Sequence, residues 1–189
     1  MAMTMHPHLD RILWTEDQIS HRVSELATQI VHDFPASSPP PVFIGVATGA
    51  FIFLADLVRK IDLPFTVDLV RVQSYGSGTV SNGAPTISSD LKVEVNGQHV
   101  ILVEDIVDTG HTLSRLISHL KLKGASSVSV CTLLDKPARR KVNVQLVGEG
   151  KFYRGFECPD YFVVGYGMDF DELYRNLPYI GVLKPEHYS

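Results

Sequence analysis

Apolar residues recur at helical spacing in three parts of the chain. From Thr15 to about Asp33 they lie three to four positions apart, which predicts an amphipathic helix with Thr15 as its N-cap. The same spacing predicts helices over residues 51–60 and 112–123, and Gly124 is placed to end the second of these.

Short runs rich in Val, Ile and Leu lie between these helices and predict strands. They cover residues 42–46, 65–72, 91–95, 99–103, 127–134, 141–147, 161–164 and 180–183. The dipeptide Asn96-Gly97, between the third and fourth runs, suits a tight hairpin turn. Elsewhere strands and helices alternate, so we expect an α/β fold with a mostly parallel central sheet flanked by helices. In such sheets ligands bind beyond the carboxyl ends of the strands.

Residues 74–90, SYGSGTVSNGAPTISSD, have no apolar periodicity and are rich in glycine and serine. We expect a long mobile loop that contributes nothing to the core. Structureless loops of this length in compact domains are usually functional or disordered. Two interpretations stay open: a lid over a reactive site, or a surface loop without a role.

Composition narrows the class of protein. A chain of 189 residues fits one domain over residues 1–189. The formal charge of −4 comes without a basic stripe, which argues against nucleic-acid binding. The two cysteines lack the spacing of a zinc site or a disulfide framework. We find neither a secretory leader nor a run of about 20 apolar residues, so we expect a cytoplasmic protein without a membrane span.

Most of the residues suited to ligand binding are concentrated at 101–112, ILVEDIVDTGHT, where an apolar strand runs through a turn into a helix. Free N–H groups at a helix start favour a phosphate. Thr109 and Thr112 can add hydroxyl donors, and Gly110 allows close approach or a positive φ. The acids Glu104 and Asp105 would repel phosphate but suit the vicinal hydroxyls of a ribose. Phosphosugar binding fits this pattern better than a Walker A loop or a dinucleotide fingerprint, which it lacks.

Alternatively, each acid is a solvated strand-end residue and Thr112 is only an N-cap. Other motifs in the sequence favour a functional role for these residues. VEDIVDTGHT at 103–112 resembles the signature of the type I phosphoribosyltransferases. Further segments resemble the hypoxanthine-guanine members of that family: SY at 74–75, LLDKP at 133–137, GFECPDYFVVGYGMDF at 155–170 and YRNLPYIGVL at 174–183. The match covers about residues 42–185.

The resemblance implies the type I phosphoribosyltransferase fold, with a small hood built from the terminal segments and a mobile active-site loop. It implies a reaction of purine salvage, in which the 5-phosphoribosyl group passes from phosphoribosyl pyrophosphate to N9 of hypoxanthine or guanine. The products would be IMP or GMP and pyrophosphate, with Mg²⁺ as cofactor. Relatives of this kind are commonly homodimers or homotetramers.

The resemblance also implies roles for individual residues. Asp108 would be the catalytic acid/base at purine N7. The phosphoribosyl group would contact Glu104, Asp105, Asp108, Thr109, Gly110, His111 and Thr112. Pyrophosphate would contact Thr48, Gly49 and Arg175, and the purine would contact Lys136, Phe162, Val163 and Asp169. Mg²⁺ would bind Asp169, Glu104 and Asp105, and Ser74 and Tyr75 would begin the lid.

Two positions depart from the family pattern: Thr48 and His111 stand where many relatives carry lysine, so fewer fixed charges face the ligand. Lys136 can only donate hydrogen bonds, which favours an oxo group at C6 over adenine's amino group but does not exclude xanthine. A regulatory protein of the same fold that binds nucleotides or RNA is the alternative outside enzymes. The basic stretch 137–141 suits a subunit contact or a solvated turn.

Overall fold

The computed structural model describes residues 5–34, 39–73, 86–87 and 91–188. Three helices are present in these ranges: α1 (Glu16–Asp33), α2 (Phe51–Val58) and α3 (His111–Leu122). The strands are β1 (Leu9–Trp14), β2 (Val42–Ala47), β3 (Thr66–Gln73), β4 (Thr86–Ile87), β5 (His99–Val107), β6 (Ser127–Asp135), β7 (Phe152–Glu157), β8 (Val163–Val164) and β9 (Ile180–Leu183). Two short 3₁₀ turns are η1 (Pro137–Arg139) and η2 (Pro185–His187).

The main sheet has six strands in the order β4-β3-β2-β5-β6-β7. Every pair from β3 to β7 is parallel, and only the two-residue edge strand β4 is antiparallel. Parallel strands place their carboxyl ends at one edge. The turn after β5 therefore lies beside the ends of β2 and β6, where the sequence predicts ligand binding.

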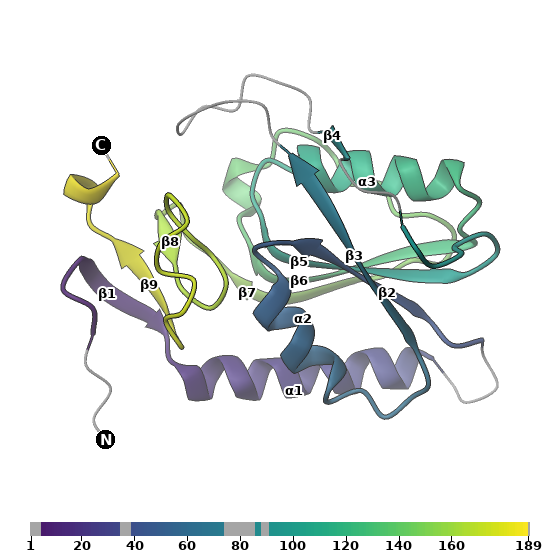
Figure 1. The fold of residues 1–189 in the computed structure, drawn as a ribbon, viewed down its shortest axis with the longest axis horizontal. Helices are drawn as coiled ribbons and strands as arrows, with labels where there is room; N and C mark the ends of the chain where they lie inside the picture. The colour runs from purple at the N-terminus through teal and green to yellow at the C-terminus, as the bar shows by residue number, and fades with distance from the viewer. Residues whose placement is uncertain (1–4, 35–38, 74–85, 88–90, 189) are drawn as a thin grey trace.

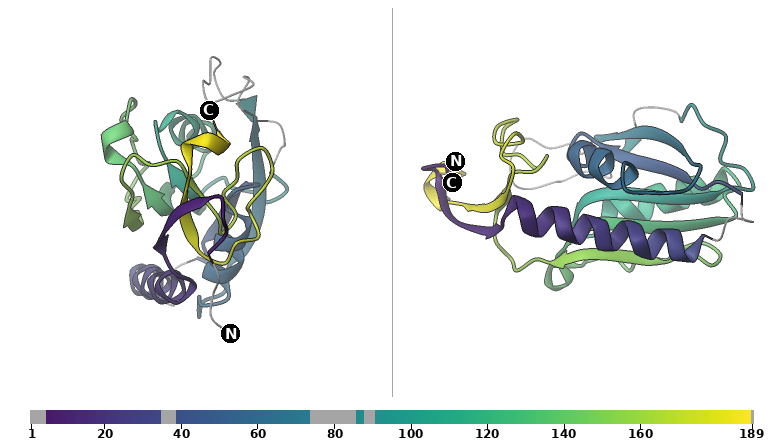
Figure 2. Two further views of the ribbon diagram at one scale, coloured as in Figure 1. Left: turned by 90° about the vertical axis from the view of Figure 1, so that its left-hand side faces the viewer. Right: turned by 90° about the horizontal axis from the view of Figure 1, so that it is seen from below.

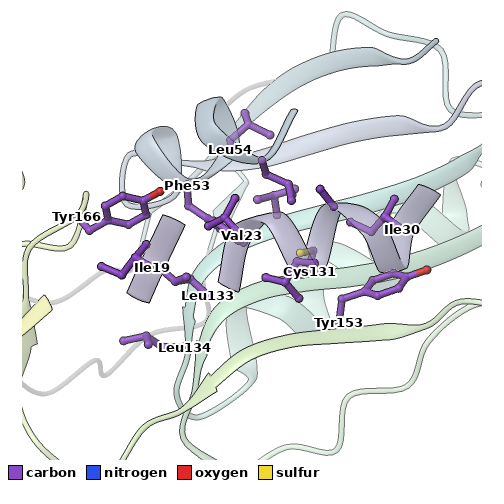
Figure 3. Close-up of a cluster of buried hydrophobic side chains, with 14 of the residues drawn as sticks. Ile19, Val23, Ile30, Phe53, Leu54, Cys131, Leu133, Leu134, Tyr153 and Tyr166 are labelled. Carbon is purple, nitrogen blue, oxygen red and sulfur yellow. The ribbon is translucent and has the colours of Figure 1, made fainter. Parts of the chain in front are cut away.

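Helices cover both faces of this sheet (Figure 1). On one face α1 and α2 pack through Ile19, Val23, Phe53 and other buried side chains (Figure 3). On the other face α3 packs through Leu113, Leu116, Ile117 and Leu120. The predicted α/β architecture is confirmed, and burial on both faces explains why the strand sequences are so uniformly apolar.

Helix α1 begins as the sequence predicts. The Thr15 hydroxyl accepts a hydrogen bond from the Gln18 N–H, and the Gln18 side chain accepts one from the Thr15 N–H. This capping box satisfies two donors that the helix itself cannot satisfy. The predicted apolar stripe is fully buried.

A second sheet forms the hood, with the antiparallel order β1-β9-β8. It lies beside the main sheet, and Figures 1 and 2 show β1 and β9 together although they come from opposite ends of the sequence. The buried side chains of Leu9, Val164, Tyr179 and Leu183 form its own apolar cluster. The hood predicted from the resemblance is confirmed.

Several predicted strands are wrong. Residues 91–95 are irregular because both edges of β5 already pair in parallel with β2 and β6, which leaves no room for an antiparallel hairpin. The Asp68 carboxylate instead accepts the N–H groups of Lys92 and Val93. Gly97 does have a positive φ of 70°. Only Val163 and Val164 of residues 161–164 form a strand.

Residues 141–147 supply only an isolated bridge between Val147 and Val128. The edge beside β6 is occupied by β7, a strand that was not predicted from the sequence. Val144 and Leu146 pack over the cluster beneath α3 instead. The predicted loop 74–90 contains the short strand β4, whose pairing with β3 was not expected. None of the described helices has the length and apolar character needed to span a lipid bilayer.

Candidate active site

A cavity of about 670 Å³ lies between the carboxyl edge of the main sheet and the hood. Its lining includes six residues predicted from sequence: Asp105, Asp108, Lys136, Phe162, Val163 and Asp169. These come from the end of β5 and the turn after it, from the residue that follows β6, and from the segment around β8. The fold thus brings together side chains more than 60 positions apart in the sequence, as the family resemblance implies.

The turn into α3 has the geometry expected of a phosphate cradle. Gly110 is the N-cap of α3, with a φ of 87° and no side-chain cap, so the first N–H groups of the helix lack a capping side chain. A smaller cavity of about 90 Å³ lies here, lined by Asp108, Thr109, Gly110 and Thr112 among others. The N-cap is Gly110, so the reading of Thr112 as a cap is wrong.

The loop after β2 lies directly against this acidic turn. A Cβ atom added at Gly49 would clash with the Asp105 carboxylate, and one added at Gly167 would clash with the Gly49 carbonyl. Arg175 donates from Nη1 to the Gly167 carbonyl at 2.7 Å. Gly49, Asp105 and Arg175 therefore belong to one neighbourhood; Gly49 and Arg175 are two of the three residues predicted to contact pyrophosphate. The Ala47–Thr48 peptide bond in this loop is cis.

Glu104 and Asp105 are a strongly coupled acidic pair. Glu104 is buried, and its Oε2 has no hydrogen-bond partner. Burial raises the pKa of Glu104 well above its ordinary value, and the neighbouring Asp105 raises it further. Burial also raises the pKa of Asp105, against the lowering effect of its hydrogen bond with Glu104 and of the Arg175 charge. An unpartnered buried carboxyl oxygen is costly, and sites that bind a polar ligand are where such a cost is retained.

Asp108 faces the cavity with its carboxylate held by a cation. Arg139 Nε donates to Asp108 Oδ1 at 2.9 Å, and Arg139 Nη1 lies 3.5 Å from Asp160 Oδ1. Arg140 bonds to the Asp108 carbonyl and makes a close ion pair with Asp135. The basic stretch 137–141 is therefore folded onto the acidic turn.

The opposite wall carries the residues expected to meet a flat base. Lys136 is buried, and its Nζ donates to the Tyr161 carbonyl at 2.6 Å. Phe162 is half-buried, with its ring perpendicular to that of Phe170 and stacked on that of Tyr188. Ile106, near the end of β5, lines the same cavity. A planar apolar slot beside a fixed lysine donor suits a heterocycle that carries an oxo group.

Asp169 and Arg175 form a separate polar cluster at the cavity rim. Arg175 Nη2 lies 3.0 Å from both Asp169 Oδ1 and Glu172 Oε2. The other Asp169 oxygen accepts the Glu172 N–H at 2.9 Å. Thr48 and His111 are exposed, whereas Ser74 and Tyr75 lie outside the described residues, so the predicted lid stays a prediction.

Across the described ranges, no group of three or more His, Cys, Asp or Glu side chains is arranged to hold a metal ion. The carboxylates of Asp105 and Asp169 nevertheless line one cavity, and Glu104 has an unpartnered buried oxygen. Hard oxygen donors of this kind fit Mg²⁺ that takes its remaining ligands from phosphates and water.

Residues 15–171 match the family model of the phosphoribosyl transferase domain. The chain belongs to the phosphoribosyltransferase family. It is 42% identical over 185 residues to the hypoxanthine-guanine phosphoribosyltransferase of Bacillus subtilis (strain 168), and the match covers 98% of this chain and 99% of that protein. The family assigned from residues 103–112 is confirmed.

Two further family members show how the chain relates to longer and to solved proteins. It is 43% identical over 186 residues, 98% of its own length, to the bifunctional protein TilS/HprT of Listeria monocytogenes serotype 4b (strain F2365), and spans 28% of that protein's length. The crystal structure of a hypoxanthine phosphoribosyltransferase from Staphylococcus aureus superposes with a TM-score of 0.88 at 41% identity, covering 100% of this chain and 99% of that one.

The sequence reading of this phosphoribosyltransferase missed Ile106, Arg139 and Tyr188 among the cavity residues. Ile106 had a local signal, because it sits inside the acidic motif as an apolar residue at a strand end. Arg139 and Tyr188 had none. Their contacts to Asp108 and Phe162 are made across 31 and 26 positions and depend on the tertiary fold.

Proposed function

We propose that this chain transfers the 5-phosphoribosyl group of phosphoribosyl pyrophosphate to N9 of hypoxanthine or guanine, in a reaction of purine salvage. The observation that carries this proposal is one cavity that joins the acidic turn after β5 to Lys136 and Phe162. The acidic turn and the start of α3 suit the phosphosugar, and the opposite wall suits a 6-oxopurine.

In this proposal the residues of the β5 turn divide the phosphosugar between them. The N–H groups at the start of α3, with Thr109, His111 and Thr112, bind the 5-phosphate. Glu104 and Asp105 accept hydrogen bonds from the ribose hydroxyls and stabilise positive charge that develops on the sugar as its bond to pyrophosphate breaks. The N–H groups of Thr48 and Gly49, together with Arg175, hold the departing pyrophosphate.

The base binds between Ile106 and Phe162, with its O6 edge toward Lys136 and its rim near Val163 and Asp169. Asp108 acts as the acid/base at N7. Because Arg139 holds Oδ1 of Asp108, we assign Oδ2 to the proton at N7. Ser74 and Tyr75 begin the segment that we propose covers the site against water.

We also propose that the carboxylates of Asp169, Glu104 and Asp105 would hold Mg²⁺ at this site. When bound it neutralises charge on pyrophosphate. We further propose that residues 1–189 form one domain, that the protein is cytoplasmic, and that it assembles as a homodimer or homotetramer.

The test is an assay with phosphoribosyl pyrophosphate, Mg²⁺ and one base at a time, namely hypoxanthine, guanine, xanthine or adenine, with identification of the nucleotide formed. We expect IMP and GMP. XMP as the main product would move the assignment to a xanthine-preferring enzyme, because Lys136 can donate to the 6-oxo group of either base. No nucleotide from any base would favour a regulatory protein of the same fold.

A further inference from the structure

The ring of Tyr188 is stacked on the ring of Phe162. Their centroids are 4.6 Å apart and their planes differ by 17°. Phe170 lies edge-on to Phe162 at 5.5 Å and to Tyr188 at 6.4 Å. Phe162 therefore has one face stacked on Tyr188 and a perpendicular contact with Phe170, and Phe162 and Tyr188 both line the cavity.

Tyr188 and Phe162 both belong to the hood and both line the cavity. Phe162, Phe170 and Tyr188 all pack against the apolar cluster of the hood, whereas Ile106 and Lys136 form the opposite side of the cavity. Since Tyr188 covers one face of Phe162, a base that stacks on Phe162 would use the opposite face.

The turn that carries Tyr188 is itself fastened to the hood. The Lys184 N–H donates to the His8 carbonyl at 3.1 Å, and Lys184 Nζ donates to the Pro7 carbonyl at 2.8 Å. The ring of His187 stacks on that of His8 at 4.0 Å. Since both ends of η2 are held in this way, Tyr188 presents its ring to Phe162 from a fixed support.

We propose that Tyr188 is a positioning residue that fixes the plane of Phe162 and thereby sets the affinity of the site for the purine base. This inference rests on the proposed function, in which Phe162 stacks on the base. An aromatic ring free to rotate offers a flat face for only part of the time. A ring held by contacts with Phe170 and Tyr188 always offers that face. Binding of the base then costs no free energy for ordering the ring.

The test separates the base from the phosphosugar by steady-state kinetics on Tyr188→Ala and Tyr188→Phe. We expect Tyr188→Ala to raise the KM for hypoxanthine about two- to tenfold, the range of one aromatic pair, with kcat and the KM for phosphoribosyl pyrophosphate unchanged. Tyr188→Phe keeps the stacked ring and should restore the wild-type KM. In a Phe162→Ala background, Tyr188→Ala should add nothing further.

A matched control is Trp14→Ala, which removes another stacked ring, 4.9 Å from that of Phe156 and outside the cavity lining. It should leave the KM for hypoxanthine unchanged. A lower KM in Tyr188→Ala would mean that Tyr188 blocks the base and would overturn the proposal, as would an unchanged KM. Wild-type formation of IMP, with its loss in Phe162→Ala, tests the proposed function separately from Tyr188.

Discussion

In the proposed mechanism Asp108 links sugar binding to base binding, because it follows Glu104 and Asp105 in sequence and its carboxylate lines the same cavity as Lys136 and Phe162. Replacing it by asparagine keeps the size of the side chain and its contact with Arg139 but removes the ability to carry a proton. We expect Asp108→Asn to lower kcat by about 10²- to 10⁴-fold, the usual contribution of a positioned acid/base. The measurement is kcat with hypoxanthine under saturating substrates; turnover equal to that of the wild type would remove Asp108 from the chemistry.

The buried carboxyl group of Glu104 destabilises the unliganded protein. Its raised pKa means that the folded state favours the protonated carboxyl, so stability is present below the ordinary value of 4.5 and is lost as pH rises through the folded pKa. Glu104→Gln removes this pH dependence. We expect the variant to have a higher Tm than the wild type at neutral and alkaline pH, and a weaker affinity for phosphoribosyl pyrophosphate.

The predicted rise in Tm is best measured by thermal unfolding at a series of pH values, in a chelating buffer without substrate. Asp160→Asn is a matched control, because its carboxylate is exposed at the cavity rim. It should leave the pH profile of Tm as it is in the wild type. Equal profiles for Glu104→Gln and the wild type would show that the buried carboxyl carries no such cost.

At the scale of elements, α1 is tied to β7 by one carboxylate. Asp33 accepts from Lys151 Nζ at 2.6 Å and from the Tyr153 hydroxyl at 2.9 Å. Burial raises the pKa of Asp33, but these hydrogen bonds outweigh it and leave the pKa lowered. A lowered pKa contributes stability above the ordinary value of 3.8 that is lost as pH falls through the folded pKa.

We therefore expect Asp33→Asn to destabilise the protein by about 1–3 kcal/mol at pH 7, the usual effect of leaving a buried partner unpaired. At an acid pH below the folded pKa of Asp33 the variant and the wild type should converge. Urea unfolding at pH 7 and at that acid pH measures this. Glu157→Gln, which removes an exposed ion pair of β7 with Arg154, should change stability by less than about 1 kcal/mol at either pH. A deficit in Asp33→Asn that persists at acid pH would contradict the assignment.

Elements with a strong local pattern could be predicted, and those defined by distant partners could not. Helix α1 has both its cap and its apolar stripe in one continuous segment. By contrast, residues 141–147 are as apolar as β7, and which of them pairs with β6 depends on a competition for one sheet edge. The candidate site divides in the same way. The acids at the end of β5 belong to one continuous motif and could be predicted, whereas the contact of Tyr188 with Phe162 forms only when the hood folds.

At the scale of the whole molecule, the main sheet supplies one side of the cavity and the hood supplies the other. A ligand that binds only the folded protein stabilises it by about 2.7 kcal/mol at one hundred times its Kd. We expect phosphoribosyl pyrophosphate with Mg²⁺ to raise Tm by about 5–10 °C. Thermal shift with and without a chelator measures this, and a shift that EDTA leaves unchanged would exclude a shared Mg²⁺.

The pairing of the first strand with the last has a mechanical consequence. Leu9 lies opposite Leu183 and Trp14 opposite Ile180, so the two chain ends leave the hood from the same end of an antiparallel pair. Force applied between the ends would load these hydrogen bonds one after another, like a zipper, rather than all together. A molecule stretched between its ends would lose the hood side of the cavity first, while the turn into α3 on the parallel sheet was still intact.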